Sequence, residues 1–271
     1  MKVVLFCGGL GMRLREFSEN IPKPMVPIGY RPIIWHLMKY YAHFGHKDFI
    51  LCLGYKADAI KRYFLEYDEC ISNDFVLDGQ SGKPALLNSD IHDWRITFVD
   101  TGMHSNIGMR LKAVRKHLQG EDAFLANYSD GLSDLPLPDL IRCHREHGKI
   151  ATFLCVSPAQ SFHAVSLQPD GNVTGIHDLS RSGISINGGF FVFTNEIFDH
   201  IRSGEELVHE PFARLIALRQ LRAYPYEGFW ASMDTFKDKQ RLEDLHSRGE
   251  SPWEVWRQRE PKEEINGVPA R

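Results

Sequence analysis

The chain has 271 residues, 43% of them hydrophobic, with a formal net charge of -3 at pH 7 and a sequence pI near 6.5. This length allows one α/β domain with a large core, and the charge disfavours nucleic acid and anionic membranes as general partners. No segment approaches the roughly 20 apolar residues of a membrane span, and the first apolar run is too short for a signal peptide. We therefore expect a cytoplasmic protein without nucleic-acid or membrane partners.

Short apolar runs alternate with helical patterns along the first 155 residues. The runs at 3–7, 49–53, 96–99, 123–128 and 151–156 are expected to be strands. Helices are expected from about Pro32, over 107–118 and over 138–147, where apolar residues recur at helical spacing. This alternation is typical of βαβ units with a mostly parallel sheet.

From residue 157 onward the strand patterns become shorter and turn signals appear, PDGN at 169–172 and NGG at 187–189. We expect antiparallel β segments added to the sheet, and then a polar helix with further helical turns over 237–256. The charged segment 258–271 is expected to be a flexible tail. The fold class predicted from these patterns is α/β.

Cysteine and histidine patterns indicate no metal centre. The five cysteines lack CxxC spacing and mostly lie in apolar runs, so we expect reduced core thiols. His144 and His147 are three residues apart but do not form an HExxH motif, so we expect a solvated helix face there.

A glycine-rich loop follows the first expected strand and reads Gly8, Gly9, Leu10, Gly11, Met12, Arg13, Leu14. Glycines at such a place let backbone N–H groups approach phosphate oxygens, and an arginine adds a fixed positive charge. The loop is neither a GxxxxGK[ST] motif nor a dinucleotide fingerprint, because a leucine stands where the third glycine belongs. It therefore indicates a phosphate site of another kind.

Lys23 strengthens this interpretation. It lies between Pro22 and Pro24, which stiffen the backbone and hold the ammonium group in place. A lysine alone would be expected on the solvated surface, but a lysine held this way shortly after a glycine loop indicates phosphate binding.

Several motifs together resemble the sugar-1-phosphate nucleotidyltransferases, and among them the glucose-1-phosphate cytidylyltransferases. The similar segments are GGLGMRL, KPMVPIG, VDTG at 99–102, RLK at 110–112, YSDGLSDL at 128–135, INGGFFV at 186–192, GFWASMDTFKDK at 228–239 and SPWEVW at 251–256. The resemblance implies a Rossmann-like core in one domain over 1–257, with nucleotide binding in 1–156 and acceptor binding in 157–257. It also implies Mg²⁺ dependence and a homo-oligomer, a trimer or hexamer.

The resemblance assigns roles to residues of this chain. Asp130 and Asp234 match the two metal ligands of the family, a donor set that suits Mg²⁺ with substrate phosphate oxygens. Arg13, Lys23 and Asp130 are the expected catalytic residues of an in-line attack by an acceptor phosphate on the α-phosphorus of CTP, which needs no general base. The expected nucleotide contacts are Gly8, Gly9, Gly11, Met12, Arg13, Lys23, Arg110 and Ser129.

The acceptor side departs from the family pattern. Relatives carry a Glu-Lys-Pro triplet whose lysine holds the sugar phosphate, whereas this chain has Asp178, Leu179 and Ser180. The family's Arg-Phe-Gly is replaced by SFH at 161–163, and its Thr-Gly-Gly by IGM at 107–109. Arg181 and His163 are hypothetical replacements for the lost cations, and Asn187 and Asp178 are the other expected acceptor contacts.

Three alternatives follow from this pattern. Glucose 1-phosphate is the default acceptor, and a different phosphate or phosphonate acceptor is the main competitor because a lost phosphate-binding lysine removes about 1.5–3 kcal/mol of binding. The third is a non-catalytic relative that binds nucleotide. No single residue chooses cytosine over uracil or thymine, so CTP rests on the overall resemblance.

Overall fold

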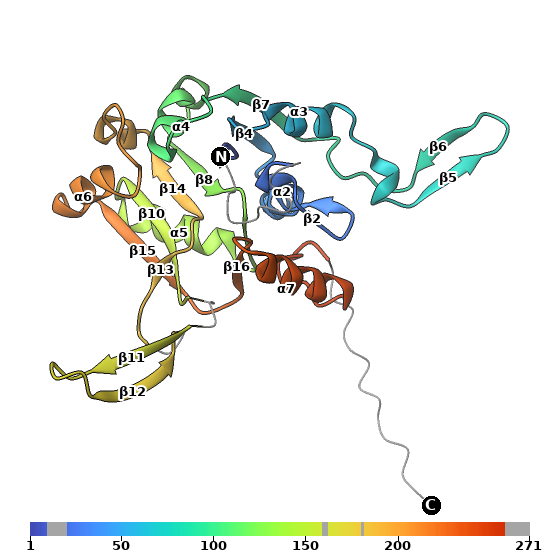
Figure 1. Ribbon diagram of the computed structural model, residues 1–271. Helices are drawn as coiled ribbons and strands as arrows, with labels where there is room; N and C mark the ends of the chain where they lie inside the picture. The colour runs from blue at the N-terminus through green and yellow to red at the C-terminus, as the bar shows by residue number, and fades with distance from the viewer. Residues whose placement is uncertain (10–20, 159–161, 180–181, 258–271) are drawn as a thin grey trace, which may run out of the picture.

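The central feature of the computed structural model is an eight-stranded sheet that carries helices on both faces (Figure 1). Residues 1–9, 21–158, 162–179 and 182–257 are described. The strand order is β13-β10-β14-β8-β1-β4-β7, with β15 paired to β10. The strands are β1 Val3–Phe6, β4 Asp48–Leu53, β7 Arg95–Asp100, β8 Ala123–Tyr128, β10 Ala151–Val156, β13 Ile186–Asn187, β14 Phe191–Thr194 and β15 Leu221–Tyr226.

The sheet is mixed. The neighbours β8, β1, β4 and β7 are all parallel, as are β10 and β15, whereas β14 runs antiparallel to both β8 and β10. Glycines interrupt the chain between β13 and β14, where Gly189 has a φ of 77°. A Cβ at this position would lie 2.3 Å from the side-chain oxygen of Asn127, so both the backbone angle and the space require glycine.

Helices and short sheets complete the architecture. The α-helices are α2 Ile33–His43, α3 Ala57–Leu65, α4 Ile107–Ala113, α5 Leu137–His147, α6 Glu210–Ala217 and α7 Phe236–Ser247, and the 3₁₀ helices are η2 Lys23–Met25, η3 Glu69–Ile71, η4 Arg115–Leu118 and η6 Asn195–His200. The two-stranded sheets pair β2 Pro27–Ile28 with β3 Arg31–Pro32, β5 Phe75–Asp78 with β6 Lys83–Leu86, β9 Gly131–Ser133 with β16 Trp230–Ser232, and β11 His163–Leu167 with β12 Val173–Asp178.

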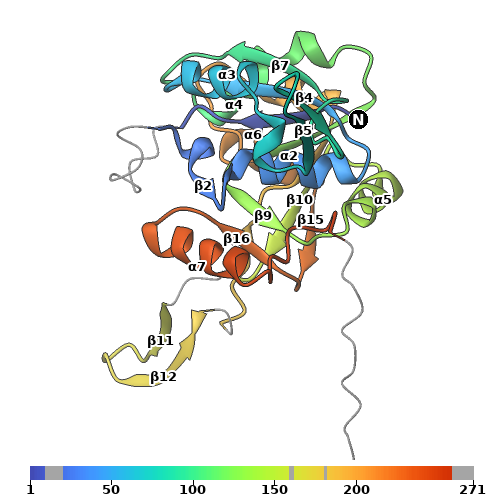
Figure 2. The same ribbon diagram turned by 90° about the vertical axis from the view of Figure 1, so that its right-hand side faces the viewer.

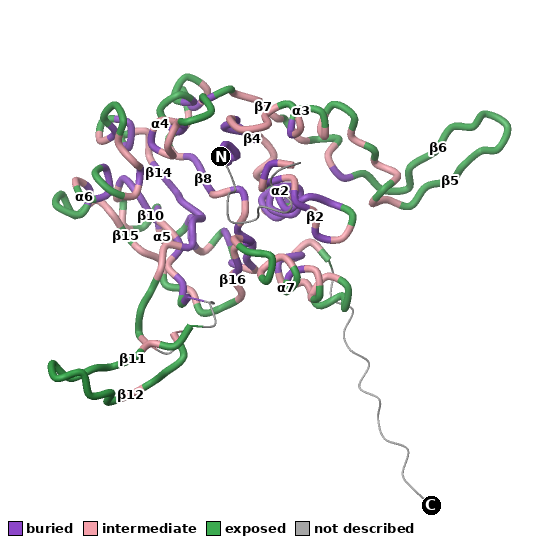
Figure 3. The backbone as a smooth tube through the Cα atoms, viewed as in Figure 1, coloured by how far each residue is buried: buried purple, intermediate pink, exposed green. Residues whose placement is uncertain are grey.

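Alternation along β1 divides the interior into two cores. Val3 and Leu5 pack with apolar residues of α2, α5 and α7, whereas Val4 and Phe6 pack with those of α4, α6 and η6. All four side chains are buried, because successive residues of a central strand point to opposite covered faces. Figure 3 shows this buried centre beside the exposed β5–β6 and β11–β12 hairpins, which project from the body.

The predicted α/β fold class is confirmed, with a mostly parallel sheet, flanking helices and added antiparallel strands. All five predicted strands are present, with bounds shifted by one residue at most. The helix predicted over 107–118 ends at Ala113 and continues as the separate 3₁₀ helix η4. The added strands are not all antiparallel, since β15 runs parallel to β10.

The structure also bears on the expected state of the cysteines and on membrane-spanning helices. All five cysteines are free, but only Cys7 and Cys52 are buried, so the prediction of core thiols is wrong for the other three. Within the described ranges, no helix is long and apolar enough to cross a membrane.

Candidate active site

Lys23, Asp130 and Asp234 come together from three distant parts of the chain. Lys23 begins η2, Asp130 follows the carboxyl end of β8, and Asp234 follows β16 and precedes α7. The Lys23 Nζ donates hydrogen bonds to Asp130 Oδ2 and, over 2.8 Å, to Asp234 Oδ1. One ammonium group is therefore held between two carboxylates.

Strand pairing brings the two aspartates together. β9 and β16 are antiparallel with Ser232 opposite Gly131, and the Met233 amide donates to the Asp130 carbonyl over 2.9 Å. Each aspartate thus lies at the same end of this small sheet. Figure 2 shows β9 and β16 between α2 and α7.

Partial burial makes the charges of this cluster interdependent. The exposed fractions of the side chains are 16% for Lys23, 22% for Asp130 and 34% for Asp234. Burial acts to lower the pKa of Lys23, but the two carboxylates outweigh it and raise that pKa above its ordinary value. Lys23 is therefore a firmly charged ammonium at neutral pH.

The start of the glycine loop is held by Arg110 of α4. Arg110 is 2% exposed as a residue, and its guanidinium donates to the carbonyl oxygens of Gly8 (2.9 Å), Leu53 (3.0 Å) and Gly102 (3.0 Å). A Cβ at Gly8 would lie 2.0 Å from Arg110 Nη1, so a side chain at this position would displace the guanidinium. Arg110 was predicted to contact nucleotide; the contacts observed are with backbone carbonyls and the Thr101 hydroxyl, and the nucleotide contact stays a prediction.

Ser129 is also turned toward the protein. Its hydroxyl donates to the Phe6 carbonyl at the end of β1 over 2.8 Å, and the side chain is buried. The neighbouring Cys7 thiol is fully enclosed, and burial raises its pKa to about 12, so it is not a nucleophile at neutral pH. Ser129 and Cys7 join the carboxyl ends of β1 and β8, the sheet edge at which α/β folds bind ligands.

Residues predicted on the acceptor side fall into two groups. Asn187 donates to the Tyr128 hydroxyl over 3.1 Å and accepts from the Gly189 amide, so it lies beside the end of β8. His163 and Asp178 face each other at the base of the exposed β11–β12 hairpin, with 3.4 Å between His163 Nε2 and Asp178 Oδ1.

Other predicted positions lie outside the described residues: Gly11, Met12, Arg13 and Arg181, together with Ser180. Gly9 is described and exposed. The roles predicted for these residues stay predictions.

Ser232, Thr235 and Asp238 are site residues that the sequence reasoning missed. Ser232 Oγ donates to Asp234 Oδ2 over 2.8 Å. Thr235 and Asp238 form a capping box at the start of α7, and the Asp238 carboxylate also accepts from the Asp234 amide over 3.2 Å. The spacing of Thr235 and Asp238 before a helical pattern is a signal that could have revealed the cap.

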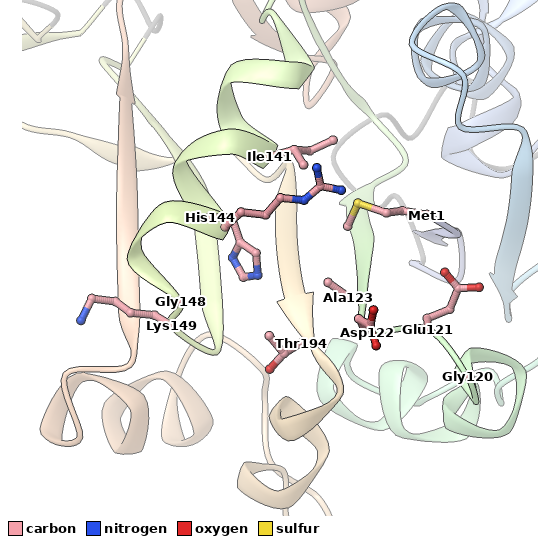
Figure 4. A pocket seen from close by; sticks show the side chains of 11 residues that line it. Met1, Gly120, Glu121, Asp122, Ala123, Ile141, His144, Gly148, Lys149 and Thr194 are labelled. Carbon is pink, nitrogen blue, oxygen red and sulfur yellow. The ribbon is translucent and has the colours of Figure 1, made fainter.

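The prediction of a solvated face at His144 and His147 is wrong. Both imidazoles lie 2.8 Å from the buried Thr152 Oγ1, and the Lys149 amide donates to His147 Nδ1. His147 Nε2 therefore donates to the Thr152 hydroxyl, which donates in turn to His144 Nδ1. His144 also lines a pocket of about 480 Å³ at the start of β8, the end opposite Asp130 (Figure 4).

Comparison with known proteins identifies the family of this chain. The model of the nucleotidyl transferase family matches residues 2–230. The chain belongs to the nucleotidyl transferase family. It is 40% identical over 258 residues to glucose-1-phosphate cytidylyltransferase of Salmonella typhi, covering 94% of this chain and 100% of that protein. The resemblance predicted from the motifs is thereby confirmed, and the protein is a nucleotidyltransferase enzyme.

Two further relatives extend the comparison. The probable glucose-1-phosphate cytidylyltransferase of Bacillus subtilis (strain 168) is 36% identical, with the alignment covering 94% of this chain and 100% of the relative. The UTP-bound UGPase from Acinetobacter baumannii has the same fold, with a TM-score of 0.65 at 19% identity over 91% of this chain and 92% of that one. The Rossmann-like description of the core is consistent with these relatives.

Proposed function

We propose that this nucleotidyltransferase transfers the cytidylyl group of CTP to the phosphate of glucose 1-phosphate, giving CDP-glucose and pyrophosphate. The observation that carries the proposal is the 40% identity to a glucose-1-phosphate cytidylyltransferase along its whole length. The cluster of Lys23, Asp130 and Asp234 supplies the charges that such a reaction uses. We further propose that the protein is a homo-oligomer, as expected from the resemblance.

The reaction proceeds by direct displacement. An oxygen of the acceptor phosphate forms a bond to the α-phosphorus of CTP while the bond from that phosphorus to the bridging oxygen of pyrophosphate breaks. An ionised phosphate is already a nucleophile, so no protein base removes a proton. The protein contributes positioning and positive charge, for which Arg13 and Lys23 are the proposed groups on the triphosphate.

The residues present fit a Mg²⁺ ion. Asp130 and Asp234 offer two carboxylates at one place, and Mg²⁺ is usually bound through one or two carboxylates together with phosphate oxygens and water. Among the described residues there is no group of three or more His, Cys, Asp or Glu side chains that could hold a metal alone. The ion would neutralise charge on the triphosphate and the departing pyrophosphate.

A second candidate is a cytidylyltransferase for another phosphate or phosphonate acceptor. Leu179 stands where relatives carry the acceptor lysine, and His163, a hypothetical replacement cation, faces the Asp178 carboxylate. A phosphate lacking a cation would lose on the order of one to two decades of affinity. This loss favours an acceptor that is held by other contacts.

Pyrophosphate release tests both candidates. The purified protein is incubated with Mg²⁺, each nucleoside triphosphate and a panel of phosphorylated acceptors. Release with CTP and glucose 1-phosphate is expected, and release only with another acceptor would support the second candidate. Asp130→Asn and Asp234→Asn should each abolish turnover, because each removes a charge of the proposed metal site. Full activity in either variant would contradict the metal assignment.

A further inference from the structure

The Lys23 ammonium occupies the space between the two proposed metal ligands. Its Nζ donates to Asp130 Oδ2 and Asp234 Oδ1, so one oxygen of each carboxylate is already used. The other oxygen of Asp234 accepts from Ser232 Oγ over 2.8 Å. A metal ion bound through these same two oxygens, at the distance of about 2.1 Å that is usual for Mg²⁺, would occupy the space that the ammonium fills. Lys23 and the metal therefore compete for these oxygens.

Neither the metal ion alone nor the nucleotide alone can favourably take the place of the contacts that Lys23 makes here. The three side chains are partly buried, so an unpaired charge among them is costly. A metal arriving alone would expel the ammonium and leave it without its two partners. A nucleotide arriving alone would add negative charge beside two carboxylates and would draw their counter-ion away.

Arrival of both ligands resolves this conflict. With both ligands bound, a divalent ion would place two positive charges between Asp130 and Asp234 instead of one, and the triphosphate would offer acceptor oxygens to the released ammonium. Pro22 and Pro24 limit movement of the backbone, so rotation of the four-carbon stem is the movement left to the Lys23 ammonium.

We propose that Lys23 is an internal counter-ion that excludes the metal from the free enzyme and couples metal binding to nucleotide binding. This inference rests on the proposed function, because it requires the metal site and the triphosphate site. It adds a second role for Lys23, which holds the carboxylates in the free enzyme and the phosphates in the complex. By linkage, nucleotide tightens metal binding by the same factor by which metal tightens nucleotide binding.

The test measures Mn²⁺ binding to the whole protein by electron paramagnetic resonance of the free ion, with and without CTP. Lys23→Met removes the charge and keeps the length of the side chain. Without CTP, this variant should bind Mn²⁺ on the order of tenfold to a hundredfold more tightly than the wild type. CTP should tighten Mn²⁺ binding in the wild type and have a much smaller effect in Lys23→Met.

Three further variants serve as controls. Lys47→Met removes a lysine that is 42% exposed and paired with Asp93, so its Mn²⁺ affinity should equal that of the wild type. Lys23→Arg keeps a cation at the site and should bind Mn²⁺ without CTP as weakly as the wild type. The double variant Lys23→Met/Asp234→Asn should lose the gained affinity, because the gain requires both carboxylates.

Equal Mn²⁺ affinity of the wild type and Lys23→Met without CTP would overturn the proposal, as would retention of the gain in the double variant. Neither measurement depends on turnover. A failure of the proposed function appears separately, as absence of pyrophosphate release from CTP by the wild type with every acceptor.

Discussion

Arg110 is a buried cation whose observed hydrogen-bond partners all belong to the protein. Besides Gly8, Leu53 and Gly102, it donates to the Thr101 hydroxyl over 2.7 Å. Burial acts to lower its pKa, yet guanidinium remains charged in proteins. A charged donor to the buried carbonyls of Gly8 and Leu53 fixes the ends of β1 and β4 relative to α4, and so fixes where the glycine loop starts.

Arg110→Met should lower the free energy of unfolding by roughly 3 kcal/mol, because buried carbonyl oxygens lose their donors. Urea unfolding measures this change. The matched control is Arg115→Met, since Arg115 is 59% exposed and its nearest carboxylate, on Asp199, is 3.7 Å away and exposed too. Unchanged stability with a raised KM for CTP would instead identify Arg110 as a nucleotide contact.

Among the elements, the β5–β6 hairpin has the clearest unexplained surface. Phe75, Val76, Leu77 and Leu86 are 42%, 57%, 60% and 41% exposed. An isolated two-stranded hairpin is only marginally stable in water, and clustered exposed apolar side chains mark interaction surfaces. Since we propose a homo-oligomer, this hairpin is the surface we expect at its interface.

The double variant Val76→Asp/Leu77→Asp should shift the protein toward the monomer in sedimentation velocity, because it places charge on both faces of the hairpin. Its free energy of unfolding, measured in dilute solution, should change by no more than about 0.5 kcal/mol, as is usual for surface sites. The comparison variant Val165→Asp lies on the other projecting hairpin, where the side chain is 51% exposed. An unchanged sedimentation coefficient in the hairpin variant would exclude β5–β6 from the interface.

At the scale of the whole molecule, the features that could be predicted from the sequence are those encoded by local patterns of residues, such as the strands of the central sheet. Buried parallel strands have continuous apolar runs, so β1, β4, β7, β8 and β10 were predictable. The closeness of Lys23, Asp130 and Asp234 was not, because it depends on the pairing of β9 with β16, two three-residue strands almost 100 positions apart. The resemblance of the motifs predicted that these residues share a function, but only the structure shows that they are in contact.

Two buried histidines, His36 and His144, make the stability of the protein depend on pH. His36 is 1% exposed, donates from Nε2 to the Ile28 carbonyl over 3.1 Å and accepts from Trp253 Nε1 over 3.3 Å. Burial lowers the pKa of His36 to about 3, and burial with the nearby His147 lowers the pKa of His144 to about 4. Both imidazoles are therefore neutral in the folded protein across the physiological range.

Acid should destabilise the fold through these two groups. An unfolded histidine has a pKa of about 6.5, so between that pH and the lower folded values only the unfolded state gains a proton. The stability that these two groups contribute should be fully present above pH 6.5 and should fall as the pH is lowered toward about 4, with each imidazole contributing about 1.4 kcal/mol per pH unit. Urea unfolding of the wild type and His36→Gln at several pH values measures this dependence. Because the substitution also removes packing contacts at every pH, each free energy of unfolding of the variant is compared with its own value at pH 7.5. Below pH 6.5, the free energy of unfolding of the variant should fall less steeply than that of the wild type, by the contribution of one imidazole, about 1.4 kcal/mol per pH unit. Identical slopes in the two proteins would show that His36 does not carry the acid sensitivity.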